Sequence, residues 1–422
     1  MTSRREFIYK GLLAAASISS AGFPGILHAQ NKRPTVKVVG THVTLQPHLK
    51  ARAEKELGIN LEFYPGGSAE VLLKATTDPT SFDLYEQWSN SVRPLWQADA
   101  IQPIETSRLK YWNEISPLAK TGKLTEKAKI GAGDSPNKIL FIQPNGTLGP
   151  NPTDQITFMP YVHNVDSFGY NTQKIPAGIP YETESWGWLL DNKYQGRVAL
   201  VNDPTIGLFD AALAIQAQGF MSFKDIGNFS RDELDQMFTI LTDLKSQGQF
   251  RGVWSSVPHS IKLMATHQVD IQSMFSPAVA SLNGMGVPCI YAAPKEGYRA
   301  WHGVMSLSSE SRGESKDAAY EYMNWWLSGY AGAFIARQGY YISNPERSRQ
   351  FMSQAEWDYW YLGKPASEML QGTDGKNSIK AGEIRTGGSY HRRFENIAVW
   401  NTVIPNYEYS LRKWNEFVLA GV

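Results

Sequence analysis

The sequence predicts an α/β protein built as two lobes. Strands and helices alternate from Thr35 to Ala98 in the order of a βαβ unit. Val198 to Val201 form a short apolar run, which is typical of a strand covered on both faces. The 422 residues exceed what one hydrophobic core usually holds, so two lobes are expected.

Each element follows from a local pattern of apolar, capping and turn residues. In the first part of the chain we expect a strand at 35–40, a helix at 46–57, a strand at 60–64, a helix at 68–76 capped by Ser68, a strand at 82–85, a helix at 91–98 and a long surface connection at 106–154. The middle part is expected to form strands at 156–162 and 198–201, a helix at 207–216, a helix at 230–247 with a Ser230 capping box, a helix at 260–267, a strand and turn at 269–277 and a strand pair at 288–293 and 299–303. The last part is expected to form a helix at 316–332, a turn at 339–345 and two helices within 389–420 that carry Trp400 and Trp414.

The composition describes an ordinary soluble protein. The formal net charge is +1 and charged residues make up 19%, which argues against nucleic acid or an anionic membrane as the main partner. Aromatic residues make up 12%, including 13 Trp and 20 Tyr, and such rings also stack on small molecules. The single cysteine, Cys289, excludes an internal disulfide and a cysteine metal cluster, and its apolar surroundings in the sequence predict a buried, inert thiol.

The N-terminus carries the pattern of a twin-arginine export signal over residues 1–29. Arg4 and Arg5 precede Phe7, Ile8 and Lys10, an apolar stretch follows, and a cleavage site stands after Ala29. A basic amphipathic helix is the alternative. The signal predicts a mature protein that is soluble in the periplasm.

Loops at the ends of the predicted strands are candidates for a binding crevice, because ligands gather at the carboxyl ends of strands in open α/β sheets. Three such loops lie at residues 40–42, 65–67 and 86–90, and none has the spacing of a phosphate loop. Asp203 follows the strand at 198–201 and stands where a binding carboxylate would stand. Alternatively, Asn202 and Asp203 only cap the helix at 207–216.

The order of three blocks resembles the periplasmic substrate-binding proteins of spermidine/putrescine ABC importers, which are extracellular solute-binding proteins. The blocks are 185–204, 293–301 and 338–340. The resemblance implies a type II periplasmic-binding-protein fold, in which each lobe is a mixed sheet flanked by helices and the ligand cleft lies between the lobes. Lobe 1 is expected at 30–159 and 303–350 and lobe 2 at 160–302 and 351–422. It also implies a monomer without cofactor, metal or catalytic activity, which closes on a small solute and delivers it to inner-membrane ABC permease subunits.

The resemblance also implies which residues contact the solute. Trp88 and Trp301 are expected on opposite sides of the cleft, and Asp203 is expected to hold an amine. The full set of candidate ligand-binding residues is Thr41, His42, Thr44, Trp88, Ser89, Asn90, Tyr161, His163, Asp203, Phe275, Ser276, Trp301, His302, Tyr340 and Arg393.

Two departures change the expected solute. Ile206 and Gly303 stand where the polyamine binders carry acids, so Asp203 has no other matched acid to share a polycation's charge. Arg392 and Arg393 offer positive charge, or else they form a solvated start of a helix. These departures favour a solute with one cationic nitrogen, with or without an anionic end, such as an amino acid, opine or betaine.

Two other functions stay open. A twin-arginine signal also occurs on exported enzymes, although no G-x-S-x-G or H-E-x-x-H motif is present. Tyr340 and Tyr341 form a pair of the kind that holds ferric iron in other periplasmic binding proteins.

Overall fold

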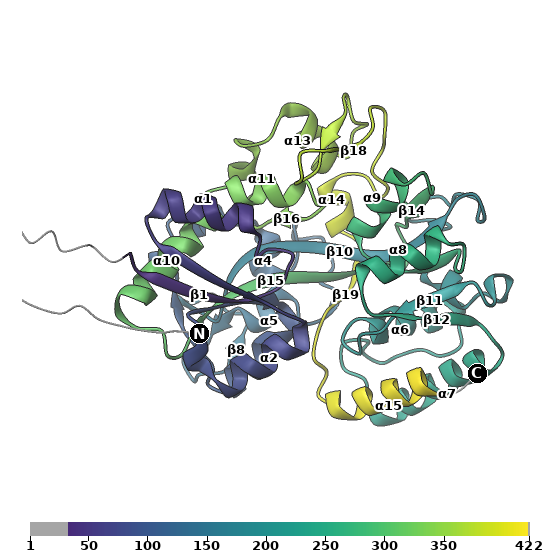
Figure 1. The fold of residues 1–422 in the computed structure, drawn as a ribbon. Coiled ribbons are helices and arrows are strands. Elements are labelled where there is room, and N and C mark those ends of the chain that lie inside the picture. Colours follow the sequence, from purple (N-terminus) through teal and green to yellow (C-terminus); the bar gives the residue numbers. More distant parts are fainter. Residues whose placement is uncertain (1–32, 421–422) are drawn as a thin grey trace, which may run out of the picture. The chain divides into compact units, whose positions relative to one another are not determined.

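The computed structural model describes residues 33–420, so the predicted export signal at 1–29 lies outside the described residues. Most strands belong to one large mixed sheet, in the order β12-β11-β13-β10-β15-β3-β1-β2. We call the part around β1, β2 and β3 the β1 lobe and the part around β11, β12 and β13 the β11 lobe. This architecture confirms the predicted mixed α/β fold (Figure 1).

The elements of the β1 lobe are β1 (Thr35–Gly40), α1 (Pro47–Leu57), β2 (Asn60–Pro65), α2 (Ser68–Thr77), β3 (Leu84–Trp88), α3 (Val92–Gln97), β4 (Ile101–Gln102), α10 (Gly313–Leu327), α11 (Tyr330–Ala336) and β16 (Tyr341–Ile342). Those of the β11 lobe are β11 (Val198–Val201), α6 (Gly207–Gln218), α7 (Arg231–Ser246), β12 (Phe250–Trp254), α8 (Val257–Ala265), β13 (Ile271–Met274), α9 (Ser276–Gly284), β14 (Cys289–Tyr291) and α15 (Tyr407–Leu419).

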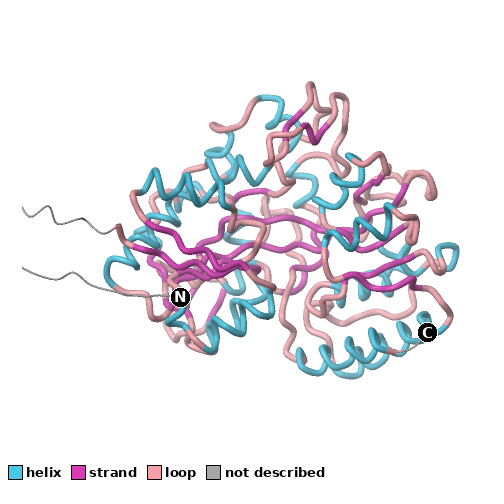
Figure 2. The backbone as a smooth tube through the Cα atoms, viewed as in Figure 1, coloured by secondary structure: helices cyan, strands magenta, loops and turns pink. Residues whose placement is uncertain are grey.

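The two lobes share two long strands, β10 (Met159–Asn171) and β15 (Tyr298–Ser308), in which every residue is buried. The two strands pair antiparallel with each other at the centre of the sheet. Beyond that centre, β15 pairs with β3 of the β1 lobe, and β10 pairs with β13 and β14 of the β11 lobe. Figure 2 shows both strands passing from one lobe into the other. The predicted lobe boundaries at 159/160 and 302/303 fall within these strands and stay a prediction.

Strand β11 shows why the apolar run at 198–201 forms a buried strand. Val198 and Leu200 pack into one core cluster with α6, α7 and α15, while Ala199 and Val201 pack into another with α8 and α9. Side chains alternate between the faces of a strand, so a strand covered on both faces is apolar throughout. Helices therefore cover both faces of the sheet here, as Figure 1 shows.

The remaining elements pack around these two lobes. Those between β4 and β10 are β5 (Ile104–Glu105), α4 (Pro117–Thr121), β6 (Ala132–Gly133), α5 (Pro136–Ile139), β7 (Phe141–Ile142), β8 (Leu148–Gly149) and β9 (Gln155–Ile156). Those of the segment that follows β16 are α12 (Pro345–Arg349), α13 (Gln354–Trp360), β17 (Leu370–Gln371), β18 (Asn377–Ile379), α14 (Tyr390–Phe394) and β19 (Ile397–Trp400).

Several sequence predictions are wrong in detail. The segment 106–154 is not a surface connection, because short elements within it bury residues such as Leu118 and Ile139. The strands β14 and β15 both pair with β10 and not with each other. The predicted helix at 316–332 is two helices, which are separated at Gly329, where φ is +115°. Trp400 lies on strand β19 and not on a helix.

Two predicted caps have different outcomes. The Ser230 capping box is present: Ser230 accepts a hydrogen bond from the backbone of Glu233, whose carboxylate accepts one in return. Ser68 does not cap α2, because the N-cap residue is Gly67. Cys289 is buried as predicted, and burial raises the pKa of its thiol to about 12.

Candidate ligand-binding site

A cavity of about 280 Å³ lies between the core of the β1 lobe and the α8/α9 side of the β11 lobe. We call it the aromatic cavity. It is lined by Val43, Ser68, Trp88, Asp166, Val201, Asn202, Asp203, Ile206, Trp254, Ser255, Ser256, Val257, Phe275, Trp301, Tyr340 and Asn401.

Three aromatic rings form its wall on the β1 lobe. Trp88 ends β3, Trp301 lies on β15, and the ring centroids of these two residues are 4.4 Å apart. Tyr340 follows α11 and packs edge-on against Trp301, with 5.5 Å between centroids. Because β3 pairs antiparallel with β15 and Trp88 stands opposite Gly303, Trp88 and Trp301 point to the same face of the sheet. The expectation that they lie on opposite sides of the cleft is wrong.

The wall on the β11 lobe is formed by Trp254 and Phe275. Their ring centroids are 5.3 Å apart and their planes nearly perpendicular. Trp254 ends β12, and its indole Nε1 donates a 3.1 Å hydrogen bond to the carbonyl of Ser273, which fixes the ring. Rings on both walls can enclose a cation with their negative faces once water is excluded.

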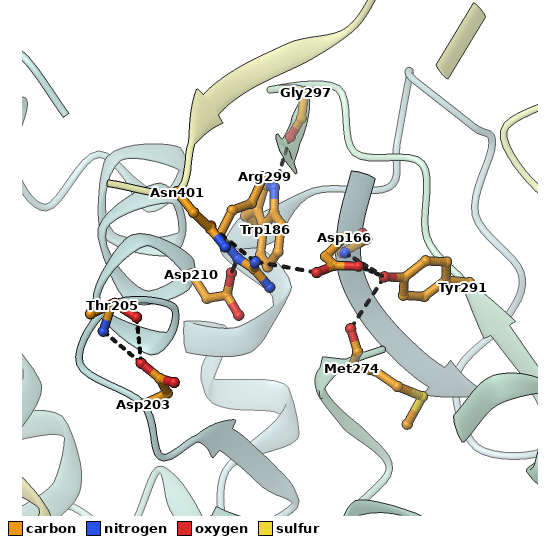
Figure 3. A network of polar contacts seen from close by, with 11 residues as sticks. Asp166, Trp186, Asp203, Thr205, Asp210, Met274, Tyr291, Gly297, Arg299 and Asn401 are labelled. Atoms are coloured by element: carbon orange, nitrogen blue, oxygen red, sulfur yellow. Dashed lines mark hydrogen bonds and ion pairs between the residues drawn. The ribbon is translucent and has the colours of Figure 1, made fainter. Parts of the chain in front are cut away.

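Asp203 lies in the loop between β11 and α6 and supplies a carboxylate to the cavity. Its Oδ1 accepts hydrogen bonds from the backbone N (2.8 Å) and the hydroxyl (2.7 Å) of Thr205, as Figure 3 shows. Oδ2 has no hydrogen-bond partner among the described residues. The N-cap residue of α6 is Ile206, which has no side-chain cap. Asp203 therefore shapes the turn before the helix, leaving one carboxylate oxygen for another partner.

A hydrogen bond joins the two lobes at this loop. The side-chain amide of Asn90, which follows β3 in the β1 lobe, donates to the Thr205 hydroxyl at 3.3 Å. The same hydroxyl donates to Asp203. The bond therefore connects the β1 lobe to the turn that orients the Asp203 carboxylate.

A buried charged network centred on Arg299 reaches the cavity through Asp166 and Asn401, and Figure 3 shows this network. The guanidinium of Arg299 is fully buried and lies 2.7 Å from Asp210 and 3.3 Å from Asp166. Its Nη1 also donates to Asn401 at 3.2 Å. Asp166 stands opposite Arg299 in the pairing of β10 with β15, so the fold itself brings the charges together. One cation between two carboxylates leaves a net negative charge at the wall of the cavity.

Asp166 is the charged member of this network that lines the cavity, where Asn401 also lies. Burial raises its pKa to about 6, even though Arg299 acts in the opposite direction. The Tyr291 hydroxyl lies 3.2 Å from its Oδ1. Asp166 is thus a second acid beside Asp203, which the sequence analysis missed. Asp166 lies among polar residues between two predicted strands, and no local sequence pattern there indicates a binding residue.

The structure brings together five of the candidate residues: Trp88, Asp203, Phe275, Trp301 and Tyr340 all line the aromatic cavity. Asn90 does not line the cavity, but its amide donates to the Thr205 hydroxyl, which donates to Asp203. The other candidates do not line the cavity. His42 is exposed, Thr41 and Ser89 are buried in the loops beside it, and Val43 occupies the lining position in the first loop.

Several other candidates belong to the packed interior. The Tyr161 hydroxyl donates a 3.2 Å hydrogen bond to the Thr44 hydroxyl within the β1 lobe. His163 lies 3.0 Å from the Tyr390 hydroxyl, and burial lowers the pKa of His163 to about 3. His302 is equally buried, and burial lowers its pKa to about 3 as well. Ser276 and Arg393 line a different cavity.

The two tyrosines considered for iron point to different places. Tyr340 lines the aromatic cavity, whereas the Tyr341 hydroxyl donates to the carbonyl of Trp360 and accepts from Arg385. In the described range, 33–420, no group of three or more His, Cys, Asp or Glu side chains could hold a metal ion. The hydroxyls of Tyr340 and Tyr341 therefore do not converge on one point, as a pair that holds ferric iron would have to do.

Within the part of the chain that the structure describes, no helix has the length and apolar character needed to cross a bilayer.

Similar structures come from several bacteria. The TpPotD lipoprotein of Treponema pallidum matches with a TM-score of 0.64 and 12% identity, over 92% of this chain and 100% of that one. The spermidine/putrescine ABC transporter substrate-binding protein PotD from Streptococcus pneumoniae matches with a TM-score of 0.59 and 12% identity, over 91% and 99%. The binding protein MotA from A. tumefaciens B6, solved in complex with glucopine, matches with a TM-score of 0.56 and 13% identity, over 91% and 100%. Likeness at such identities shows the fold.

A search of curated proteins found no match. Residues 49–359 match the family model of the bacterial extracellular solute-binding proteins, which is most of the chain. With a two-lobed binding-protein fold and a lined cavity between the lobes, the chain belongs to the bacterial extracellular solute-binding protein family.

Proposed function

We propose that this protein is the periplasmic substrate-binding component of an ABC importer and that it captures a small solute with one cationic nitrogen in the aromatic cavity. The observation that carries the proposal is the combination of five aromatic rings with two carboxylates, Asp203 and Asp166, around one small cavity. Cation–π contact and charge pairing both favour an ammonium group in such surroundings.

The size and charge of the cavity argue against a long polyamine. About 280 Å³ is at the small end for ligand pockets. Asp166 already pairs with Arg299, so its charge is shared. A bound polyamine would bring several ammonium groups into the cavity, whose lining has one carboxylate without an ion pair, that of Asp203. The other ammonium groups would be buried without a partner, and each such charge is costly. An amino acid, betaine or opine fits this balance better, and MotA, a structure of the same fold, holds glucopine.

A thermal-shift series tests the solute class, because a ligand that binds only the folded protein raises its melting temperature. We expect choline, glycine betaine or γ-aminobutyrate to stabilise the protein more than spermidine does. The matched control is 3,3-dimethylbutanol, which has the shape of choline without its charge. Equal stabilisation by choline and this neutral analogue would show that the cavity does not select a cation.

The pKa of Asp166 predicts how binding depends on pH. Because burial raises this pKa from 3.8 to about 6, the carboxyl becomes charged only as the pH rises through about 6. Affinity for a cationic solute should therefore increase between pH 5 and pH 7, a range that extends roughly one pH unit to each side of that pKa. The contribution of this carboxyl to folding stability has the opposite sign: it is fully present below pH 3.8 and is lost as the pH rises through about 6.

Titration calorimetry across this range checks the prediction. Asp210, Arg299 and Tyr291 face Asp166 from α6, β15 and β14. Burial also raises the pKa of Glu86 to about 7. The Asp166→Asn variant separates the two acids, since it should bind with an affinity that no longer changes near pH 6. An unchanged pH profile in that variant would assign the effect to another buried acid, such as Glu86 or Asp210, whose pKa burial also raises.

Export belongs to the same proposal. We infer that the twin-arginine signal carries the chain to the periplasm, so exchanging Arg4 and Arg5 for lysine should leave the precursor in the cytoplasm in a cell-fractionation assay.

A further inference from the structure

A second cavity of about 660 Å³ lies on the other side of the wall formed by the neighbouring segments 275–276 and 339–340. We call it the arginine cavity. Phe275 and Tyr340 line the aromatic cavity, whereas Ser276 lines the arginine cavity and Gly339 accepts a hydrogen bond from its Arg385. Helix α9, β14 and β18 surround it and lie side by side in Figure 1.

Arg385 stands at the wall of this cavity and is 9% exposed. Its Nη2 donates to the carbonyl of Gly339 at 2.8 Å, and its Nη1 donates to the Tyr341 hydroxyl. The guanidinium also lies 5.0 Å from the ring centroid of Tyr341 and 4.9 Å from that of Trp360. All these partners are neutral, so the positive charge of Arg385 is held in place without being neutralised.

Arg393, on α14, adds a second cation to the same wall. It is fully buried, and its Nη1 donates to the carbonyl of Thr386 at 2.6 Å. Its Nε and Nη2 have no hydrogen-bond partner among the residues that the structure describes. Buried guanidinium N–H groups without acceptors are costly, because each has given up its bonds to water. These donors are suited to an acceptor that enters through the cavity.

The two arginines lack a counter-ion. Within residues 33–420, no ion pair joins either guanidinium to a carboxylate. Burial lowers the pKa of Arg385, and the positive charge of Arg393 lowers it further, although the nearby tyrosines act in the opposite direction. At the rim, the charge of Lys380 is offset by that of Glu383, so the cavity keeps the two positive charges of its arginines.

The rest of the lining limits which anion fits. Val279, Ile290 and Trp360 provide apolar surface, and Asn283 provides an amide. An inorganic ion would leave this apolar surface facing water in the remaining volume, whereas an organic acid would cover it. Arginine donors form two parallel bonds with a carboxylate.

We propose that the arginine cavity is a second ligand site, which binds an organic carboxylate with an apolar body through Arg385 and Arg393. Both arginines lie beyond residues 49–359, the part of the chain that matches the family model. The C-terminal segment therefore supplies both cations of the site, while α9 and β14 supply part of its lining. The site does not depend on the proposed amine site, from which the wall at 275–276 and 339–340 separates it.

Titration calorimetry with benzoate at low ionic strength tests the site. We expect binding to the wild type and a loss of about tenfold or more in Arg385→Gln, because the variant removes a charge-assisted pair of hydrogen bonds. The matched control is Arg392→Gln. Arg392 neighbours Arg393 on α14 but stacks over Tyr181, 4.7 Å from its ring, and is not part of the cavity lining. This control should bind benzoate within about twofold of the wild type.

Ala280→Glu provides a test that does not disturb a buried residue. Ala280 is exposed on α9 at the lining of the cavity, so glutamate there keeps the helix and places a negative charge at the entrance. Benzoate should bind about tenfold more weakly or not at all. Asp203→Asn should leave benzoate binding unchanged, so failure of the amine site and failure of this site are distinguishable.

Three outcomes would overturn the proposal. The first is no heat of binding with millimolar benzoate. The second is unchanged binding in both Arg385→Gln and Ala280→Glu. The third is displacement of benzoate by an equal concentration of inorganic phosphate, which would show a general anion site without a preference for an apolar body.

Discussion

Replacing Arg299 by leucine is expected to lower the free energy of unfolding by about 3 to 5 kcal/mol, the usual cost of removing one partner from a buried ion pair. The side chains of Arg299, Asp166 and Asp210 are 0%, 4% and 0% exposed, so no solvent compensates for the loss. The variant leaves two carboxylates in a dry core without a cation. Urea denaturation at pH 7 measures the effect.

The same change should be rescued by removing the carboxylate charges. Combining Arg299→Leu with Asp166→Asn and Asp210→Asn should recover most of the stability, since the remaining groups are neutral. Arg337→Leu is the control, because its ion pair with Glu356 is partly exposed and should contribute about 1 kcal/mol or less. If Arg299→Leu unfolds at the urea concentration of the wild type, the network does not stabilise the fold.

Asp203→Asn should weaken binding of a cationic solute by about 2 to 5 kcal/mol, the range for truncating one partner of a desolvated charge pair. The asparagine oxygen can still accept the two hydrogen bonds from Thr205, so the turn before α6 should persist. What is lost is the charge on the oxygen that has no partner in the described residues. Titration calorimetry measures the affinity, and thermal melting confirms that the variant is folded.

Asp191→Asn is a matched control for this experiment. Asp191 Oδ1 accepts from the backbone of Lys193, two residues ahead, just as Asp203 accepts from Thr205, but Asp191 is not part of the aromatic cavity. This control should bind normally. If Asp203→Asn melts normally and binds within about threefold of the wild type, Asp203 serves the turn alone.

Local sequence patterns were sufficient for much of the fold. The alternation that predicted β1, α1, β2 and α2 depends on residues close in the chain, and the structure confirms these elements within one or two residues. Helix α9 was missed because Ser276 and Pro277 were interpreted as a turn. Proline also fits the first turn of a helix, where its missing N–H needs no acceptor.

The long strands show what a sequence alone cannot supply. His163 and Asp166 interrupt the apolar pattern of β10, so the strand was predicted to end at residue 162 and continues to Asn171. Their polar groups are satisfied by Tyr390 and by Arg299, which lie far away in the chain. The same long-range pairing conceals Asp166 as a site residue. Asp203 was found from its place at the end of a predicted strand, and Trp301 was found because a family resemblance marked it.

Gly303 has a consequence for how solute preference can change over evolutionary time. A Cβ added at this position would lie 2.9 Å from Cε1 of Tyr161, a ring that is itself fully buried. An acidic residue here, where the polyamine binders that this chain resembles have one, therefore cannot arrive by a single substitution without a clash. A side chain at residue 303 therefore needs a shift or a replacement of Tyr161, so these two positions should change together.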